Sequence, residues 1–307
     1  MGLLAFVFPG QGAQYVGMGF DLYSQSETAH EILNQAEGLM PGLLDLCFNQ
    51  PSPRLTKTNI AQPAIFAVSY AAAAAAREAG LQPRASAGFS LGEWTAIADA
   101  GMLPFEAAFR LVQQRGRLMQ ACAEGQPGGM AAILRKSAEE VTALIQGYEG
   151  IHAVNFNAPD QVVVAGAHSA LDRFLADMKT RGVRAMKLNV AGAFHSPYMA
   201  EAGRALETQL KHARFQEPAI PVYSNLNAQP YRREQAADTL ARQVTSSVLW
   251  VDSIRNMADA GCDTFLELGP GKVLSGLIQK ILPEARVFQA EDLAGIQAAA
   301  RMIGEHA

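Results

Sequence analysis

Short apolar runs alternate with longer segments of helical periodicity along this chain, and this alternation restricts the fold more than any other feature. The runs of strand length are LLAFVF, RASAGF, IPVYS and CDTFLEL. Between the first and the third run, the spacing of apolar residues predicts a helix over 60–79 and two more helices that end by Ala123. Strands that alternate with helices in this way form a parallel α/β sheet.

Three glycine-rich loops follow predicted strands: FPGQG, GFSLG and ELGPG. Ligands of parallel α/β sheets bind outside the carboxyl ends of the strands, where such loops lie. We therefore expect the three loops to converge on one site. The last loop continues as GK but lacks the full phosphate-binding pattern, so we interpret it as a turn that borders the site.

The pattern changes between the glycines of 125–129 and the loop at Gly192. It reads strand, helix, strand, strand, helix, strand, over 130–134, 138–146, 151–155, 161–165, 170–181 and 184–190. This order is that of a ferredoxin-like unit. We predict a large α/β domain in two parts, 1–125 and 194–307, with a small ferredoxin-like α+β domain inserted at 126–193.

Composition excludes several classes of protein. The chain has 307 residues, 49% of them hydrophobic, a net charge of −4, and no cluster of basic and aromatic residues, which argues against nucleic-acid binding. The N-terminus lacks a signal-peptide pattern, and the alanine-rich run over 67–76 is too short and weakly apolar to cross a membrane, so we expect a cytoplasmic protein. Cys47, Cys122 and Cys262 are odd in number and far apart, and we interpret them as buried thiols.

Ser90 is the first candidate for chemistry. It is the centre of GFSLG, and G-x-S-x-G spacing suits a sharp strand-to-helix turn that exposes a nucleophilic hydroxyl. A plain turn of small residues is the alternative interpretation.

His195 is the candidate base for this serine. It lies in GAFHSPYM just before a predicted helix, which Ser196 can cap and which Pro197 suits as a first residue. We expect the positive end of that helix to keep the imidazole neutral. The other histidines, His30, His152, His168, His212 and His306, have polar or helical contexts and are interpreted as surface residues.

Arg115 is a charge on an apolar helix face. It lies within the stripe formed by Ala108, Leu111, Val112, Leu118, Met119 and Cys122, whereas Arg110 and Arg117 lie on the opposite, polar face. A buried arginine requires an anion, so it binds either a structural carboxylate or the carboxylate of a substrate.

The PGQG turn offers backbone N–H groups and the side-chain amide of Gln11 near the expected site. Together with the N–H of Leu91, which follows the serine, these donors can form an oxyanion hole.

Six segments, in this order along the chain, are similar to the motifs of a known family: FPGQGAQYVGMG, GFSLGEW, QQRGRLM, NAPDQVVVAG, GAFHSPYM and ELGPGKVL. The chain resembles the malonyl-CoA:acyl carrier protein transacylases of fatty acid and polyketide synthesis. The resemblance implies a hydrolase-like α/β core with an inserted ferredoxin-like domain. It also implies Ser90 as nucleophile, His195 as base, Arg115 as carboxylate-binding residue and Gln11 as oxyanion donor.

The resemblance further implies a malonyl-serine intermediate, with malonyl-CoA as donor and an acidic acyl carrier protein as transient partner. No permanently bound cofactor and no metal is expected, and we expect a monomer. A basic patch would serve the carrier protein, and its candidates are Lys187, Lys211, Arg232, Arg233, Lys272 and Lys280. An acyl-thioester hydrolase and a non-catalytic carrier-binding module remain alternatives.

Three further positions are expected to shape the substrate pocket. The family usually has histidine where Phe89 stands, and often glutamine where Leu249 precedes Trp250. The main-chain carbonyl at that second position could still orient His195, because no third triad carboxylate is evident in the sequence. Phe194 would lie beside the acyl chain and favour malonyl over branched donors, as the resemblance implies.

Overall fold

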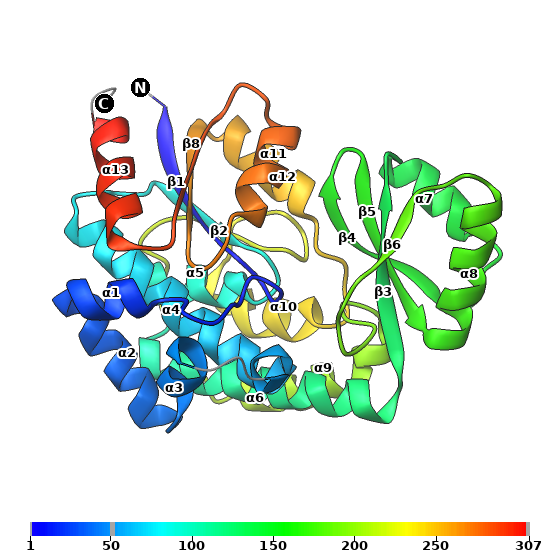
Figure 1. Ribbon diagram of the computed structural model, residues 1–307, viewed down its shortest axis with the longest axis horizontal. Coiled ribbons are helices and arrows are strands. Elements are labelled where there is room, and N and C mark those ends of the chain that lie inside the picture. The colour runs from blue at the N-terminus through cyan, green and yellow to red at the C-terminus, as the bar shows by residue number, and fades with distance from the viewer. Residues whose placement is uncertain (1, 50–52, 305–307) are drawn as a thin grey trace.

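The structure is a computed structural model that describes residues 2–49 and 53–304. It has a larger parallel sheet and a smaller antiparallel sheet that lie side by side along its longest axis (Figure 1). The larger sheet has the strand order β7-β2-β1-β8-β9. Its strands are β1 (Leu3–Phe8), β2 (Ala85–Gly88), β7 (Val222–Tyr223), β8 (Cys262–Leu268) and β9 (Arg286–Ala290). All of its strand pairs are parallel, which confirms the predicted fold class.

Both faces of the central strand β1 are buried. Leu4, Phe6 and Phe8 belong to one apolar cluster, and Ala5 and Val7 belong to a second cluster on the opposite face. Successive side chains of a strand point to opposite faces, so a strand covered on both sides is apolar throughout. This explains why LLAFVF lacks polar alternation.

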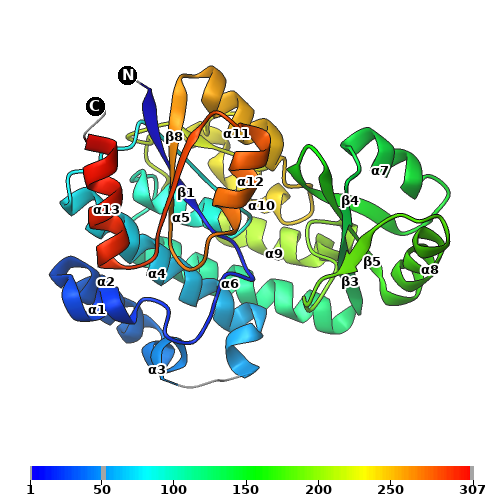
Figure 2. The same ribbon diagram turned by 45° about the horizontal axis from the view of Figure 1, so that its top comes forward.

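Helices on both faces supply this cover. The helices of the larger part before the small sheet are α1 (Phe20–Gln25), α2 (Glu27–Leu39), α3 (Leu43–Phe48), α4 (Thr58–Glu78), α5 (Gly92–Asp99) and α6 (Phe105–Gly125). Those after it are α9 (Ala200–Leu210), α10 (Ala236–Gln243), α11 (Trp250–Asp259), α12 (Val273–Ile281) and α13 (Leu293–Gly304). Short 3-10 turns are η1 (Pro53–Thr56), η2 (Pro197–Met199) and η3 (Arg233–Gln235). The N-terminal and C-terminal ends of the described chain lie close together (Figures 1 and 2).

The alanine-rich helix α4 lies inside the molecule, as the sequence predicts. Ala71, Ala72 and Ala76 are completely buried, and the helix ends beside Gly80, whose φ is 89°. Alanine has no side chain beyond Cβ, so the helix can approach its neighbours closely. Its tight packing against α6 holds the latter helix, which carries Arg115, beside the sheet.

The smaller sheet has the strand order β4-β5-β3-β6 and is antiparallel throughout. Its elements are β3 (Gly128–Leu134), α7 (Ala138–Ile145), β4 (Ile151–Ala158), β5 (Gln161–Ala167), α8 (His168–Thr180) and β6 (Ala185–Lys187). This is the order of a ferredoxin-like unit, as predicted. The prediction for the last strand was too long, because after Lys187 the backbone leaves the ladder and runs toward the active-site loops. The exact domain limits at residues 126 and 193 stay a prediction.

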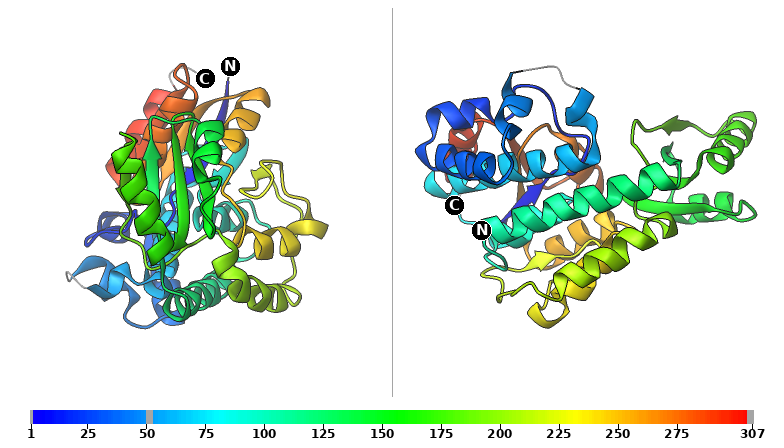
Figure 3. Two further views of the ribbon diagram at one scale, coloured as in Figure 1. Left: turned by 90° about the vertical axis from the view of Figure 1, so that its right-hand side faces the viewer. Right: turned by 90° about the horizontal axis from the view of Figure 1, so that it is seen from below.

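The edge strand β4 is hydrogen-bonded to Val248, which lies in the larger part of the chain just before α11. The N–H of Val248 donates to the carbonyl of Val154 over 2.8 Å, and the N–H of Phe156 donates to the carbonyl of Val248 over 3.0 Å. Figure 3 shows the small sheet from its outer side and, from below, helix α6 running from the core toward it. A pocket lined by residues of both parts lies between them.

Candidate active site

Ser90 lies in a sharp turn between β2 and α5. Its φ is 52°, in the left-handed region that non-glycine residues rarely adopt. A Cβ atom on Gly88 would lie 1.9 Å from the backbone of Gly92, and one on Gly92 would lie 2.0 Å from the carbonyl oxygen of Phe8. The spacing G-x-S-x-G is therefore required by close backbone packing on both sides of the serine.

The three glycine-rich loops converge, as expected. A Cβ on Gly10 would lie 2.5 Å from the carbonyl oxygen of Phe89, and one on Gly269 would lie 3.1 Å from the ring of Pro9. The N–H of Gly271 and the hydroxyl of Tyr15 both donate to Glu291, which ties the first and the last loop together.

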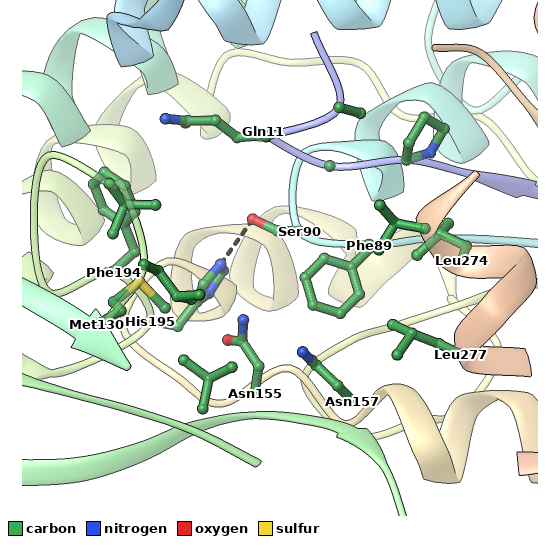
Figure 4. A pocket seen from close by; sticks show the side chains of 18 of the residues that line it. Gln11, Phe89, Ser90, Met130, Asn155, Asn157, Phe194, His195, Leu274 and Leu277 are labelled. Carbon is green, nitrogen blue, oxygen red and sulfur yellow. Dashed lines mark hydrogen bonds between the residues drawn. The ribbon is translucent and has the colours of Figure 1, made fainter. Parts of the chain in front are cut away.

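Ser90 and His195 form a hydrogen-bonded pair. The Oγ of Ser90 lies 2.7 Å from Nε2 of His195 (Figure 4), and Nδ1 of His195 lies 3.0 Å from the carbonyl oxygen of Gln243. A carbonyl only accepts, so Nδ1 carries the proton and Nε2 is free to accept from the serine hydroxyl. Gln243 is the last residue of α10, where helix carbonyls lack helical partners and can accept this bond.

The pKa of His195 is lowered to about 4, mainly by burial and also by the charge of Arg115, although the bond to the Gln243 carbonyl opposes this shift. The imidazole is therefore neutral at pH 7, as predicted. The predicted cause was wrong. Ser196 does cap Pro197–Met199, but this is a three-residue 3-10 turn, and burial is the dominant influence.

Arg115 is fully buried on α6, with 1% of its surface exposed, as the apolar stripe predicts. Its guanidinium donates to the Oε1 of Gln62 over 2.7 Å, to the Oε1 of Gln243 over 3.1 Å and to the Oγ of Ser90 over 3.1 Å. Its direct acceptors in the described chain are thus neutral, and burial lowers its pKa to about 10. A carboxylate of a substrate that entered beside Ser90 would meet this cation.

Sequence reasoning missed the polar residues behind the serine. Asn225 accepts from the N–H of Ser90 over 2.7 Å and donates to the carbonyl of Gly88 over 2.7 Å, which fixes the turn. The side chain of Gln243 donates to the carbonyl of Ser90 over 2.7 Å and to Oε2 of Glu93 over 2.6 Å. Glu93 gave no clear signal in the sequence, because an acidic residue in the first turn of a helix is common and α5 also carries Thr95 and Asp99.

Gln11 and Leu91 are the predicted oxyanion donors. The N–H of Ser90 is occupied by Asn225, whereas the N–H of Leu91 donates to no backbone carbonyl within the described ranges. The side chain of Gln11 lines the pocket and donates to Oγ1 of Thr58 over 3.2 Å. Figure 4 shows the loop of Gln11 on the side of Ser90 away from His195. Their role as oxyanion donors stays a prediction.

The pocket at Ser90 has a volume of about 290 Å³. Phe89 lines it and packs edge-on against Trp250, with 5.6 Å between ring centroids. Phe194 and Met130 line the side next to His195, and Asn155 and Asn157 enter from the small sheet (Figure 4). Both sheets thus contribute to one site.

Leu249 lies outside this pocket, which corrects its predicted place among the substrate-binding residues. It lines a separate cavity beside Asp252 and Arg255. Its N–H donates to the carbonyl of Asn225, and its own carbonyl accepts from the N–H of Ser253 in the first turn of α11. The carbonyl that orients His195 is that of Gln243, six residues earlier.

Four of the six candidate basic residues are paired with nearby carboxylates. These pairs are Lys187 with Asp172, Lys211 with Glu207, Arg233 with Glu217 and Glu234, and Lys280 with Asp160. In the part of the chain that the structure describes, no ion pair involves Arg232 or Lys272. Lys272 is exposed and directly precedes Val273, which lines the pocket.

The remaining sequence candidates lie away from this chemistry. The three cysteines are buried free thiols, as predicted. His30, His168 and His212 are exposed, His152 is half-buried, and His306 lies outside the described residues. Over residues 2–49 and 53–304, no group of three potential metal ligands gathers and no helix has the length and apolar character to cross a membrane.

Comparison with known proteins gives one consistent result. The family described as acyl transferase domain matches residues 5–306. The chain is 37% identical over 294 residues to the polyketide biosynthesis malonyl CoA-acyl carrier protein transacylase PksC of Bacillus subtilis, covering 93% of this chain and 99% of that protein. It is 38% identical over 291 residues to the polyketide biosynthesis protein PksE of the same organism, covering 92% of this chain. The chain spans 37% of the length of PksE and 24% of that of ThaF from Burkholderia thailandensis.

Solved structures agree with these relatives. The malonyl CoA-acyl carrier protein transacylase of Clostridium perfringens superimposes with a TM-score of 0.94 at 35% identity, over 99% of this chain and 98% of that one. A malonyl-transacylase in complex with its type II PKS acyl-carrier protein superimposes with a TM-score of 0.92 at 33% identity, over 98% of this chain and 99% of that one.

Proposed function

The chain belongs to the acyl transferase domain family, and from that premise we propose that it transfers a malonyl group from malonyl-CoA to the phosphopantetheine thiol of an acyl carrier protein. The observation that carries this proposal is the 3.1 Å contact between the buried guanidinium of Arg115 and the hydroxyl of Ser90. A nucleophile beside a cation whose direct hydrogen-bond acceptors in the described chain are all neutral suits an acyl donor that carries a carboxylate, since that carboxylate would bind the cation directly.

In the first half-reaction, the Oγ of Ser90 attacks the thioester carbonyl while its proton passes to Nε2 of His195. The N–H of Leu91 and a donor of Gln11 would hold the tetrahedral oxyanion. The carbon–sulfur bond then breaks, His195 returns the proton to the departing thiolate of coenzyme A, and a malonyl ester remains on Ser90. The Gln243 carbonyl keeps the imidazole oriented throughout.

In the second half-reaction, the thiol of the carrier protein attacks the ester and gives its proton to His195. Collapse of the second tetrahedral intermediate breaks the bond to Ser90, and His195 returns the proton to the Ser90 oxygen. Both half-reactions use the same groups, so the kinetics would be ping-pong. A hydrolase would share these steps and differ in admitting water to the ester.

The remaining expectations belong to the same proposal. The enzyme would work in the cytoplasm as a monomer, with malonyl-CoA as substrate and without a resident cofactor or metal. The carrier protein would bind transiently and supply the complementary negative charge. The large domain at 1–125 and 194–307 and the small domain at 126–193 would close the pocket between them.

Intact-mass measurement after incubation with malonyl-CoA tests the proposal. We expect a malonyl adduct that a carrier protein removes much faster than water does. An adduct that water removes equally fast would identify a hydrolase, and the absence of any adduct would refute acyl transfer from malonyl-CoA. Fragmentation should locate the adduct on Ser90.

A further inference from the structure

Glu93 is a buried carboxylate that no step of the proposed reaction uses. It lies on α5, three residues after Ser90, and its exposed fraction is zero. Its Oε1 accepts from the hydroxyl of Tyr231 over 2.5 Å and from the N–H of Asn225 over 3.1 Å, and its Oε2 accepts from Nε2 of Gln243 over 2.6 Å. A buried carboxylate costs several kcal/mol of desolvation unless its bonds offset it, so its position needs an explanation.

Gln243 connects this carboxylate to each reacting group. Its main-chain carbonyl accepts from Nδ1 of His195, its Oε1 accepts from Arg115, and its Nε2 donates to the carbonyl of Ser90. The direction of the amide matters, because only Nε2 can donate to Glu93 and only Oε1 can accept from Arg115. An anionic acceptor at Glu93 selects this orientation.

We propose that Glu93 is a positioning residue, which acts through the side chain of Gln243 to hold His195 and Arg115 in the geometry that activates Ser90. The inference deepens the proposed function and rests on it for the identity of the acyl donor. It makes the negative charge of Glu93, and not its volume, the property that the site requires. A neutral residue of the same shape would present a donor to Nε2 of Gln243 or force the amide to turn its Nε2 toward Arg115.

Protonation of Glu93 would have the same effect as that neutral replacement, because the added proton turns an acceptor oxygen into a donor. The titratable and charged groups that face Glu93 or its partners are Tyr231, Arg115 and His195. The pKa of Glu93 is raised to about 7, because burial outweighs the bonds to Tyr231, Gln243 and Asn225 that lower it. Burial lowers the pKa of His195 to about 4, so the two groups titrate in separate pH ranges.

The experiment follows the reaction of Ser90 with a fluorophosphonate probe between about pH 5 and pH 9, read by intact mass. This reaction needs the serine and its base but not malonyl-CoA. For the unmodified enzyme we expect the labelling rate to fall about tenfold or more as the pH decreases through 7, to a lower plateau above pH 4. Glu93→Gln should label at the plateau rate at every pH in this range. A fast Glu93→Gln variant, or an unmodified enzyme whose rate is constant across pH 7, would overturn the proposal.

Tyr231→Phe provides a second test, should Glu93→Gln not fold. It removes one bond that lowers the pKa of Glu93 while leaving Gln243 in place, so the inflection should move to higher pH. An inflection that stays in place would contradict the assignment to Glu93. The matched control is Glu267→Gln, which alters another fully buried glutamate whose bonds go to Leu274 and Ser275. It should keep the inflection near pH 7 even where it reduces stability.

The proposed effect of Glu93 on Arg115 is tested with acyl donors. Glu93→Gln should lower the ratio of malonyl to acetyl adduct several-fold, because Arg115 loses the acceptor orientation that holds it. An unchanged ratio of malonyl to acetyl adduct would show that Glu93 does not position Arg115. If malonyl-CoA gives no adduct with the unmodified enzyme while the fluorophosphonate profile behaves as expected, the proposed function fails and the role of Glu93 at His195 stands.

Discussion

The guanidinium of Arg115 donates a hydrogen bond to the hydroxyl oxygen of Ser90 over 3.1 Å, so a buried cation contacts the proposed nucleophile. The same oxygen lies 2.7 Å from Nε2 of His195. In the proposed reaction, a proton leaves toward His195 and the cation lies beside the oxygen, so negative charge that develops on Ser90 during attack would be stabilised from two directions. If an acyl group that carries its own carboxylate binds Arg115, the hydrogen bond from Arg115 to Ser90 would be lost.

Ser90→Ala should abolish both acyl-enzyme formation and transfer to the carrier protein, because the nucleophilic oxygen is absent. The fold should be retained, since Asn225 holds the turn through backbone groups at Gly88 and residue 90. Intact mass after incubation with malonyl-CoA measures the first effect and circular dichroism the second. Normal adduct formation in a folded variant would exclude Ser90 as the nucleophile.

Arg115→Ala should reduce malonyl transfer by roughly 2–5 kcal/mol in kcat/KM, the range for breaking a buried charge pair, and reduce acetyl transfer less. The comparison of the two donors separates substrate recognition from general damage to the site. Arg110→Ala is the matched control, because Arg110 is an exposed arginine on the same helix and pairs only with Glu106 within the described chain. Equal losses with both donors would make Arg115 a structural residue.

Phe194→Ser should relax discrimination against methylmalonyl-CoA. The ring of Phe194 lines the pocket beside His195. A branch methyl that pressed against this ring would cost roughly 1–3 kcal/mol through overpacking, or about ten- to hundredfold in rate. Competition between the two donors, measured as the ratio of acylated carrier products, tests this. A ratio that equals that of the unmodified enzyme would assign selectivity to another wall.

Lys272→Glu should lower kcat/KM for the carrier protein, most strongly at low salt, because Lys272 is exposed next to the pocket wall and no carboxylate pairs with it in the described ranges. Lys211→Glu is the matched control, since Lys211 is also exposed but pairs with Glu207. Kinetics at two ionic strengths provide the measurement. Salt-independent rates in all three proteins would argue against electrostatic docking of the carrier.

His195 should make the fold less stable in acid. Its pKa is lowered from 6.5 to about 4 by burial, so below pH 6.5 the unfolded chain binds a proton that the folded chain does not. Stability present above pH 6.5 is therefore lost as the pH falls toward 4, by about 2–3 kcal/mol at pH 4.5. Urea unfolding of the unmodified protein and of His195→Gln at about pH 7.5 and 4.5 measures this. The variant should lose less than the unmodified protein, and equal losses would contradict a buried neutral His195.

The sequence predicted those site residues that stand in a local sequence pattern unusual for their type. Ser90 stands in a spacing that only a tight turn needs, and Arg115 interrupts an apolar helix face. Glu93 could not be found in this way, because an acidic residue in the first turn of a helix is common. Gln243 could not be identified from the sequence. Every residue has a main-chain carbonyl, and that of Gln243 matters only because the end of α10 lies beside His195 in the folded protein.

The fold was predicted best where periodicity was strong. The ferredoxin-like order and the parallel core were correct, whereas the lengths of β6 and β7 were overestimated. A strand ends where its partner diverges, and that depends on contacts far along the chain, such as those between β2 and β7. Leu249 was also misplaced, since it lines a separate cavity.

Ser90 and His195, the proposed nucleophile and base, have backbone conformations that L-amino acids disfavour, with φ of 52° and 58°. Such conformations cost about 1–3 kcal/mol each, and glycine would relieve most of that cost. Selection for heat resistance alone would therefore favour replacements that remove the chemistry. Any effort to make this enzyme more robust needs an activity screen at these two positions, because thermal stability and catalysis select for different residues there.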